Sequence, residues 1–70
     1  MTLGNRIRNY RVERRMTQIE LAKKAGLSQS YLSDLEKNKF NPTISIIIGI
    51  AVALDVSVDG LLGLNDKKAG

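Results

Sequence analysis

The sequence predicts an all-α fold, a compact bundle of five short helices. Three observations support this prediction. Apolar residues recur at helical spacing in several segments. A residue that can cap a helix N-terminus precedes each of the last four segments. Short loops separate the segments, as is typical of packed helices. The chain has 70 residues, which is the size of a single domain.

Different sequence patterns predict the first two helices. A helix over residues 3–15 is predicted from one apolar face at helical spacing, made by Leu3, Ile7 and Tyr10. The second helix starts with a capping-box pattern, in which the side chains of Thr17 and Glu20 each accept from the other residue's backbone N–H. It runs to about Ala25, and Gly26 then supplies the left-handed residue that commonly follows a helix.

A third helix and a loop come next. Ser28 is a good N-cap for a helix that runs to about residue 37. Residues 37–42 then form a loop, because Pro42 disfavours helical geometry in the residue before it. Asparagine at position 38 also tolerates turn conformations, which fits a loop there.

Two further helices complete the bundle. Thr43 caps a fourth helix over residues 44–54. The isoleucines of this segment also favour a strand, but no other segment of the sequence could pair with it. Ser57 caps a fifth helix that ends near residue 62 or 63. The folded domain is therefore expected over residues 1–64, with a flexible C-terminal tail over residues 65–70.

Residues 18–37 have the pattern of a helix-turn-helix. Gly26 lies at the tight turn, and Ala22 is small where the third helix must pass close to the second. The apolar side chains expected to face inward are Leu21, Ala25, Leu27, Leu32 and Leu35. An ordinary helical hairpin is the simpler alternative. Agreement at seven positions in residue type and spacing favours the helix-turn-helix, which places its second helix in the major groove of DNA.

The face of the third helix opposite its leucines carries side chains that can read bases. These candidates are Gln29, Ser30, Ser33 and Asp34. Glutamine pairs with adenine through two bonds, serine can donate or accept, and a carboxylate can accept from cytosine. Asp34 could instead pair with a lysine of its own surface. Contacts to DNA phosphates are expected from Gln18 and from the loop after the helix, with Lys37, Asn38, Lys39 and Asn41. Tyr31, on the helix itself, could touch the DNA backbone or a thymine methyl group, or could simply pack.

The charge is unevenly distributed. The net charge is +4, and residues 1–40 hold nine basic residues against four acidic ones. A basic half favours a polyanionic partner such as nucleic acid. Charge runs are usually solvated surface, so the basic residues outside the loop are not assigned to DNA from sequence; they are Arg6, Arg8, Arg14, Arg15, Lys23 and Lys24.

Some classes of function are disfavoured by composition. The chain has no cysteine and no histidine, so the commonest metal ligands and the commonest general base are missing. No cofactor, no metal site and no enzymatic activity are expected. No signal peptide is visible, and the longest apolar stretch is too short to span a bilayer. A cytoplasmic protein without a membrane partner is the simplest expectation.

Three segments of the chain resemble the phage repressor and Cro family of helix-turn-helix regulators. They are residues 16–37, Asn-Pro-Thr at 41–43, and Ala-Leu-Asp-Val-Ser-Val-Asp-Gly-Leu-Leu at 53–62. The resemblance covers residues 1–63. It implies a five-helix, lambda-repressor-like domain that binds operator DNA as a dimer and regulates transcription.

The resemblance also implies roles for individual residues. Gln18 would contact phosphate and brace Gln29, and Arg11 with Glu36 would form an internal ion pair. There are two departures from the family pattern. Asn38 stands where glycine is usual, although asparagine also tolerates the left-handed conformation. Asp34 stands where a neutral or basic residue is common, which puts base reading by Asp34 in doubt.

The fourth helix suggests a homodimer. At 100° per residue, its core face would be Ile44, Ile47, Ile50, Ala51 and Leu54. The opposite face is also apolar, and a helix that is apolar all round is normally covered on both sides. We expect this face to pack against a second subunit through Ile46, Gly49, Val52 and Ala53, joined by Leu61 and Leu64. The alternative is a tolerated apolar surface.

The expected function is sequence-specific binding of a palindromic DNA operator by a dimeric transcriptional regulator, most simply a repressor. An antitoxin or a restriction-modification controller on the same fold would use the same site, with a toxin or anti-repressor as a possible protein partner. A protein–protein adaptor that has lost DNA binding is the alternative from another class.

Overall fold

The computed structural model describes residues 2–64, and this part of the chain contains five helices and no strand. The helices are α1 (Leu3–Glu13), α2 (Gln18–Ala25), α3 (Gln29–Glu36), α4 (Ile44–Leu54) and α5 (Val58–Leu62). The predicted all-α, five-helix fold is confirmed. The tail expected over residues 65–70 lies outside the described residues.

Every helix starts at a hydroxyl cap. Each of these side chains accepts from the backbone N–H three residues on, and the caps are Thr2, Thr17, Ser28, Thr43 and Ser57. At α2 the capping box is complete: Thr17 N–H donates to Glu20 Oε1 (2.8 Å), and Glu20 N–H donates to Thr17 Oγ1 (3.0 Å). The caps of the last four helices could be predicted because each one depends on a few neighbouring residues; the cap at Thr2 was not predicted.

The end of α1 differs from the prediction. The helix stops at Glu13, not at residue 15, because Arg14 already caps it. Arg15 has a left-handed backbone (φ +56°), which breaks the helix and redirects the chain toward α2. Gly26 (φ +73°) ends α2 in the left-handed conformation expected for it.

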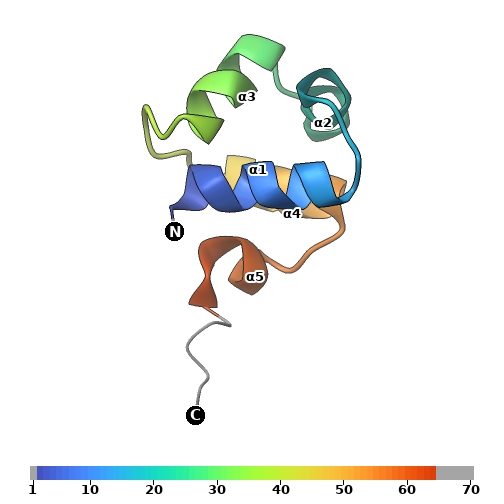
Figure 1. Cartoon of the computed structure of the whole chain (residues 1–70). Helices are drawn as coiled ribbons and strands as arrows, with labels where there is room; N and C mark the ends of the chain where they lie inside the picture. Colours follow the sequence, from blue (N-terminus) through green and yellow to red (C-terminus); the bar gives the residue numbers. More distant parts are fainter. Residues whose placement is uncertain (1, 65–70) are drawn as a thin grey trace.

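The helices are stacked in three levels (Figure 1). α1 and α4 lie side by side in the middle, α2 and α3 cover one side of this pair, and α5 covers the other. The largest fully buried side chains come from all five helices, so one core joins them; they are Ile7, Leu21, Leu32, Leu35, Ile50, Leu54 and Leu61. Burial of such side chains is the main stabilising contribution in a domain without disulfides.

Two predictions about apolar residues are wrong. Ile44 was expected in the core, but 60% of its surface is exposed, because it lies in the first turn of α4 beyond the edge of the core. Leu61 was expected to face a second subunit, but it is fully buried in its own chain. The cause is α5, which turns Leu61 toward α1 and α4.

α1 and α3 approach each other closely at Gly4. A Cβ atom at Gly4 would lie 2.5 Å from the carbonyl oxygen of Leu35 and 2.8 Å from that of Glu36. The contact therefore requires a residue without a side chain. It fixes the first turn of α1 against the last turn of α3.

Within residues 2–64, no helix has the length and apolar character needed to cross a membrane.

Gly4 in α1 and Gly49 in α4 provide a matched test of this packing. We expect Gly4→Ala to lower the free energy of unfolding by about 1–3 kcal/mol, because its methyl group would overlap backbone atoms of α3. A Cβ at Gly49 would lie 3.7 Å from the nearest such atom, the carbonyl oxygen of Ala25. Gly49→Ala should therefore be neutral or stabilise by up to about 1 kcal/mol through helix propensity. Urea denaturation of both variants measures the difference, and equal effects would contradict the close contact.

Candidate nucleic-acid interface

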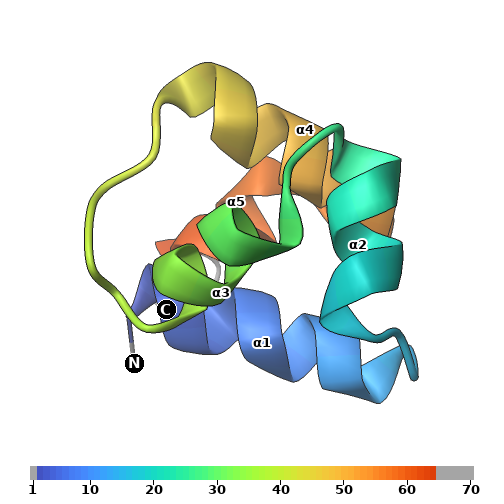
Figure 2. The ribbon, with the colours of Figure 1, turned by 90° about the horizontal axis from the view of Figure 1, so that it is seen from above.

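The four candidate base-reading residues lie together on α3. Gln29 and Ser30 are exposed in its first turn, and Ser33 and Asp34 are half-buried one turn later. All four line a single shallow depression on the protein surface. Figure 2, which looks down on the α3 side of the molecule, shows α3 between α2 and the loop that follows α3. No other helix covers α3 from this side.

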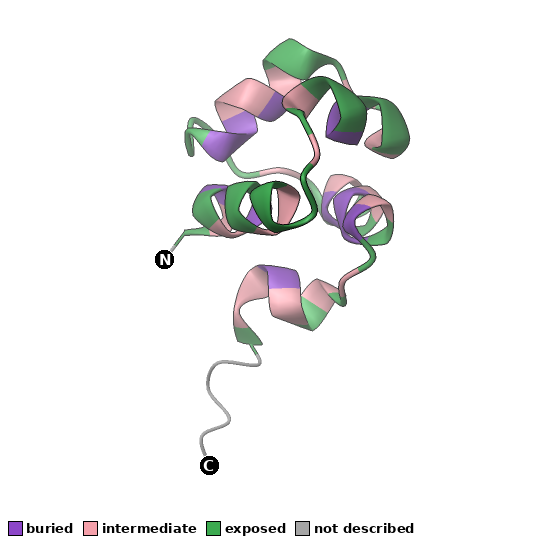
Figure 3. Ribbon diagram, turned by 45° about the vertical axis from the view of Figure 1, so that its right-hand side comes forward, coloured by how far each residue is buried: buried purple, intermediate pink, exposed green. Residues whose placement is uncertain are grey.

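The opposite face of α3 is anchored in the core. Leu32, Leu35 and Glu36 are all buried. Ser28 Oγ accepts from Tyr31 N–H (3.0 Å) and caps the helix, so its exposed first turn is well defined. Figure 3 shows the contrast between the buried and exposed sides of the α2–α3 pair. A rigid helix with one polar face outward is the form that can enter a DNA groove.

A buried carboxylate connects α3 to α1 and α2. Arg11 donates from Nε to Glu36 Oε2 (2.7 Å) and from Nη2 to Glu36 Oε1 (3.1 Å), which makes the ion pair bidentate. The side chains are 12% and 3% exposed, respectively. Arg11 also donates to the carbonyl oxygen of Met16 (2.9 Å). These are the two residues that the resemblance implied as an internal pair.

Gln18 joins the same group. Its Nε2 donates to Glu36 Oε1 at 3.1 Å. The resemblance implied that Gln18 would brace Gln29, but in this structure the bond from its side chain goes to Glu36. Gln18 is nevertheless the first residue of α2, where the backbone amides of a helix favour an anion.

The loop after α3 holds the other candidate phosphate contacts. The loop cluster consists of Lys37, Asn38, Lys39 and Asn41, and all four are exposed. Lys39 Nζ lies 3.4 Å from Asp34 Oδ1, so Asp34 does pair with a lysine of its own surface. This pairing makes Asp34 a poorer base reader than the other three candidates, because its carboxylate already has a partner.

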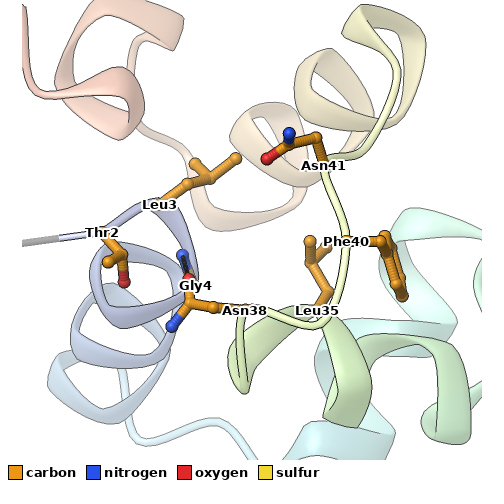
Figure 4. Close-up of a pocket in the computed structure, with 7 residues that line it drawn as sticks. All are labelled: Thr2, Leu3, Gly4, Leu35, Asn38, Phe40 and Asn41. Carbon is orange, nitrogen blue, oxygen red and sulfur yellow. Dashed lines mark hydrogen bonds between the residues drawn. The ribbon is translucent and has the colours of Figure 1, made fainter.

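Asn38 has a structural role that the sequence did not reveal. Its backbone is left-handed (φ +62°), and its Oδ1 accepts from Gly4 N–H at 3.0 Å. The amide oxygen is therefore bonded to α1, and only the Nδ2 group of Asn38, which donates, would bind a DNA phosphate. This bond ties the loop cluster to the first turn of α1 (Figure 4).

Phe40 was missed by the sequence reasoning. Its ring lies 4.8 Å from that of Tyr31, centroid to centroid, at an interplanar angle of 50°. It also lines a pocket of about 220 Å³ together with residues of α1 and α3 (Figure 4). An aromatic side chain in an otherwise polar loop was the signal available in the sequence. The contact holds the loop against α3 and makes Tyr31 a packing residue as well as a candidate phosphate contact.

The apolar surface of α4 is shifted from its predicted position. Among the expected interface residues, Val52 is 75% and Leu64 55% exposed, but Ile46, Gly49 and Ala53 are half-buried. Ile46 and Ala53 pack against the core, and Gly49 lies beside the end of α2. The exposed residues Ile44, Ile48 and Val52 are spaced four residues apart and form one line, which we name the α4 stripe.

Comparison with known proteins agrees with this geometry. Residues 7–61 match the family described as Helix-turn-helix. The chain belongs to this family. Since phage repressors and related regulators are among the helix-turn-helix proteins that it matches, the resemblance is confirmed.

Three similar proteins illustrate the relationship. The immunity repressor protein of Bacillus phage phi105 is 46% identical over 63 residues, covering 90% of this chain and 44% of that protein. SinR, the master regulator for biofilm formation, solved in complex with DNA, has a TM-score of 0.82 at 44% identity, covering 86% of this chain and 97% of that chain. The restriction-modification controller protein C.AhdI of Aeromonas hydrophila has a TM-score of 0.83 at 32% identity, covering 86% of this chain and 91% of that chain. The chain spans roughly half the length of the first curated relatives that it matches.

The buried ion pair can be tested by a double-mutant cycle. Arg11→Met and Glu36→Leu should each lower the free energy of unfolding by about 3 kcal/mol, because each leaves a buried charge without its partner. The double variant removes both charges, and its loss of unfolding free energy should be clearly smaller than the sum of the two single losses. Urea or thermal unfolding of the wild type, the two single variants and the double variant measures these free energies. Additive losses would contradict a direct interaction between the two side chains.

Proposed function

We propose that this helix-turn-helix chain is a sequence-specific, double-stranded DNA-binding transcriptional regulator, acting as a repressor. The observation that carries the proposal is the reading face of α3. Gln29, Ser30 and Ser33 are gathered in one surface depression on a helix whose other face is fixed in the core. The similarity to SinR solved in complex with DNA and to a phage immunity repressor supports the same function.

The chemistry of this face suits the major groove. Gln29 can form two bonds with the edge of an adenine, and the serine hydroxyls can donate or accept at several bases. Asp34 would act mainly by holding Lys39, since the two are already paired. The loop cluster and the first amides of α2 would bind phosphates and set the register of α3 in the groove.

We further propose a homodimer that binds a palindromic operator. The α4 stripe supports this, because three large β-branched side chains in one line on an exposed helix face are unusual for a surface. Leu64, also exposed, would extend the contact. A two-fold dimer would place two copies of α3 about 34 Å apart, one turn of DNA.

Two alternatives keep the fold and change the partner. A restriction-modification controller is favoured by the similarity to C.AhdI. An antitoxin would use the same DNA surface. A methylase gene beside the gene for this chain would indicate a controller, and a toxin gene would indicate an antitoxin. An adaptor without DNA binding would leave the reading face unused. A cytoplasmic location, with access to DNA, stays a prediction.

Selection of bound duplexes from a random pool, followed by gel shifts, tests the DNA function. We expect one palindromic sequence to be enriched and its affinity to fall steeply with salt. Gln29→Ala should lose about 1–3 kcal/mol of discrimination at one base position. Lys37→Ala is the matched control for contact with the DNA backbone, because Lys37 is exposed. This variant should weaken binding to all sequences alike. Absence of binding at low salt would exclude the DNA function and leave the adaptor.

The dimer can be tested without DNA. Ile48→Lys and Val52→Lys each place a charge within the α4 stripe and should shift the protein toward monomer in sedimentation analysis. Ile19→Lys is the matched control, since Ile19 is 54% exposed on α2 outside the stripe and should leave the association unchanged. A dimer that survives both stripe variants would rule out this interface.

A further inference from the structure

A pocket opens between the first turn of α1 and the loop after α3 (Figure 4). We name it the loop pocket. Its lining comes from residues 2–4 at the start of α1, from Leu35 of α3, and from Asn38, Phe40 and Asn41 of the loop. Its volume is about 220 Å³. The reading face of α3 lines a separate depression, so base reading leaves this pocket unused.

The loop pocket has an apolar part and a polar part. Leu35 is buried and Leu3 is half-buried, so their side chains form an apolar surface. In Figure 4 the side-chain amide of Asn41 points from the loop toward Leu3, across the opening. Within residues 2–64, this amide makes no hydrogen bond. Both its N–H groups and its oxygen are therefore available to a bound molecule.

The other loop residues of the lining are held by contacts of their own. Asn38 Oδ1 accepts from Gly4 N–H at 3.0 Å, which joins the loop to α1. The ring of Phe40 is turned away from the opening in Figure 4 and lies 4.8 Å from the ring of Tyr31. These two contacts fix the loop against α1 and α3. The pocket is therefore already formed in the folded chain, as is usual for sites that bind small molecules.

The lining limits the size and the charge of a ligand. An engineered protein cavity of about 150 Å³ holds benzene, so the loop pocket has room for a substituted ring or for two fused rings. None of the residues that line it carries a charge. A charged ligand would lose hydration without meeting an opposite charge, which is costly. The lining therefore favours an uncharged molecule.

The amide of Asn41 determines which polar edge the ligand must have. A side-chain amide presents a donor beside an acceptor, and it forms two bonds with a ring edge that presents an acceptor beside a donor, as N7 and N6 of adenine do. We propose that the loop pocket binds an uncharged planar heterocycle of about the size of a purine base, with such an edge. Its ring faces would pack on Leu3 and Leu35 while its edge pairs with Asn41.

Occupancy of the loop pocket would weaken DNA binding. This consequence rests on the proposed DNA function, whereas the binding site itself does not. Asn41 belongs to the loop cluster, which would bind phosphates, and a heterocycle paired with its amide removes that contact. Affinity should fall for all sequences alike, because phosphate contacts carry no sequence information. By linkage, bound DNA weakens the binding of the heterocycle by the same factor.

Amide NMR of the isotope-labelled chain tests the binding site without DNA. The probe is 9-methyladenine, and 9-methylpurine, which has the same rings without the amino group, is the matched comparison. We expect 9-methyladenine to shift the backbone signals of Leu3 and Gly4 and the side-chain amide signals of Asn41. Because 9-methylpurine has no donor for Asn41, its dissociation constant should be about 5-fold higher.

Two variants show whether Asn41 recognises the edge. Asn41→Leu keeps a side chain of similar size at an exposed position, so the chain should fold, and it should bind the two probes equally. Lys37→Ala is the matched control, because Lys37 belongs to the loop cluster but does not line the pocket; it should keep the preference for 9-methyladenine. Shifts centred on Gln29 and Ser30, or no shifts at millimolar probe, would overturn the proposed site. Equal binding of both probes by the wild type would overturn the proposed ligand class.

Gel shifts on the selected palindrome test the effect on DNA binding. Saturating 9-methyladenine should weaken DNA binding by roughly 5–10-fold in the wild type and in Lys37→Ala, and should leave Asn41→Leu unchanged. If the pocket binds the probe but the DNA affinity of the wild type does not change, the regulatory effect is wrong and the DNA function stands. If no duplex is bound at all, the proposed function fails, while the NMR titration still decides whether the pocket binds its ligand.

Discussion

The carboxylate of Glu36 is the point on which the arrangement of the first three helices depends. It belongs to α3, accepts two bonds from Arg11 of α1 and accepts one from Gln18 of α2. Arg11 also holds the carbonyl oxygen of Met16, which lies in the α1–α2 link. Bonds between charged groups have strict geometry, so other packings of these helices would leave a buried charge unsatisfied. The direction in which α3 presents its polar face follows from this one group.

Features that depend on neighbouring residues could be predicted from the sequence. The caps of the last four helices, the glycine after α2 and the break before Pro42 each need only a few residues, and these four helices start where the signals placed them. The end of α1 could not be predicted, because arginine seldom adopts the left-handed backbone seen at Arg15. The burial of Leu61 also depends on how α5 docks. A helix of five residues is too short for the spacing of its apolar residues to reveal which face is buried.

The candidate site also has features that could be predicted from the sequence and features that could not. The polar face of α3 was predictable as the side opposite its leucines, and its four residues do lie together. A lysine partner for Asp34 was foreseen, but the partners of Gln18 and Asn38 were not. Gln18 meets Glu36 across 18 positions, and Asn38 meets Gly4 across 34. Such pairs depend on the packing of whole helices, and no local pattern of residue types indicates them.

The bond between Asn38 and Gly4 has a practical consequence for handling the protein. It joins the second residue of α1 to the loop beside α3, and Thr2 caps the same helix end. An affinity tag fused ahead of Thr2 would lie next to this loop and could displace it. α5 lies on the far side of the α1–α4 pair, away from α3 (Figure 1). Purification handles and fluorescent labels therefore belong at the C-terminal end of the chain.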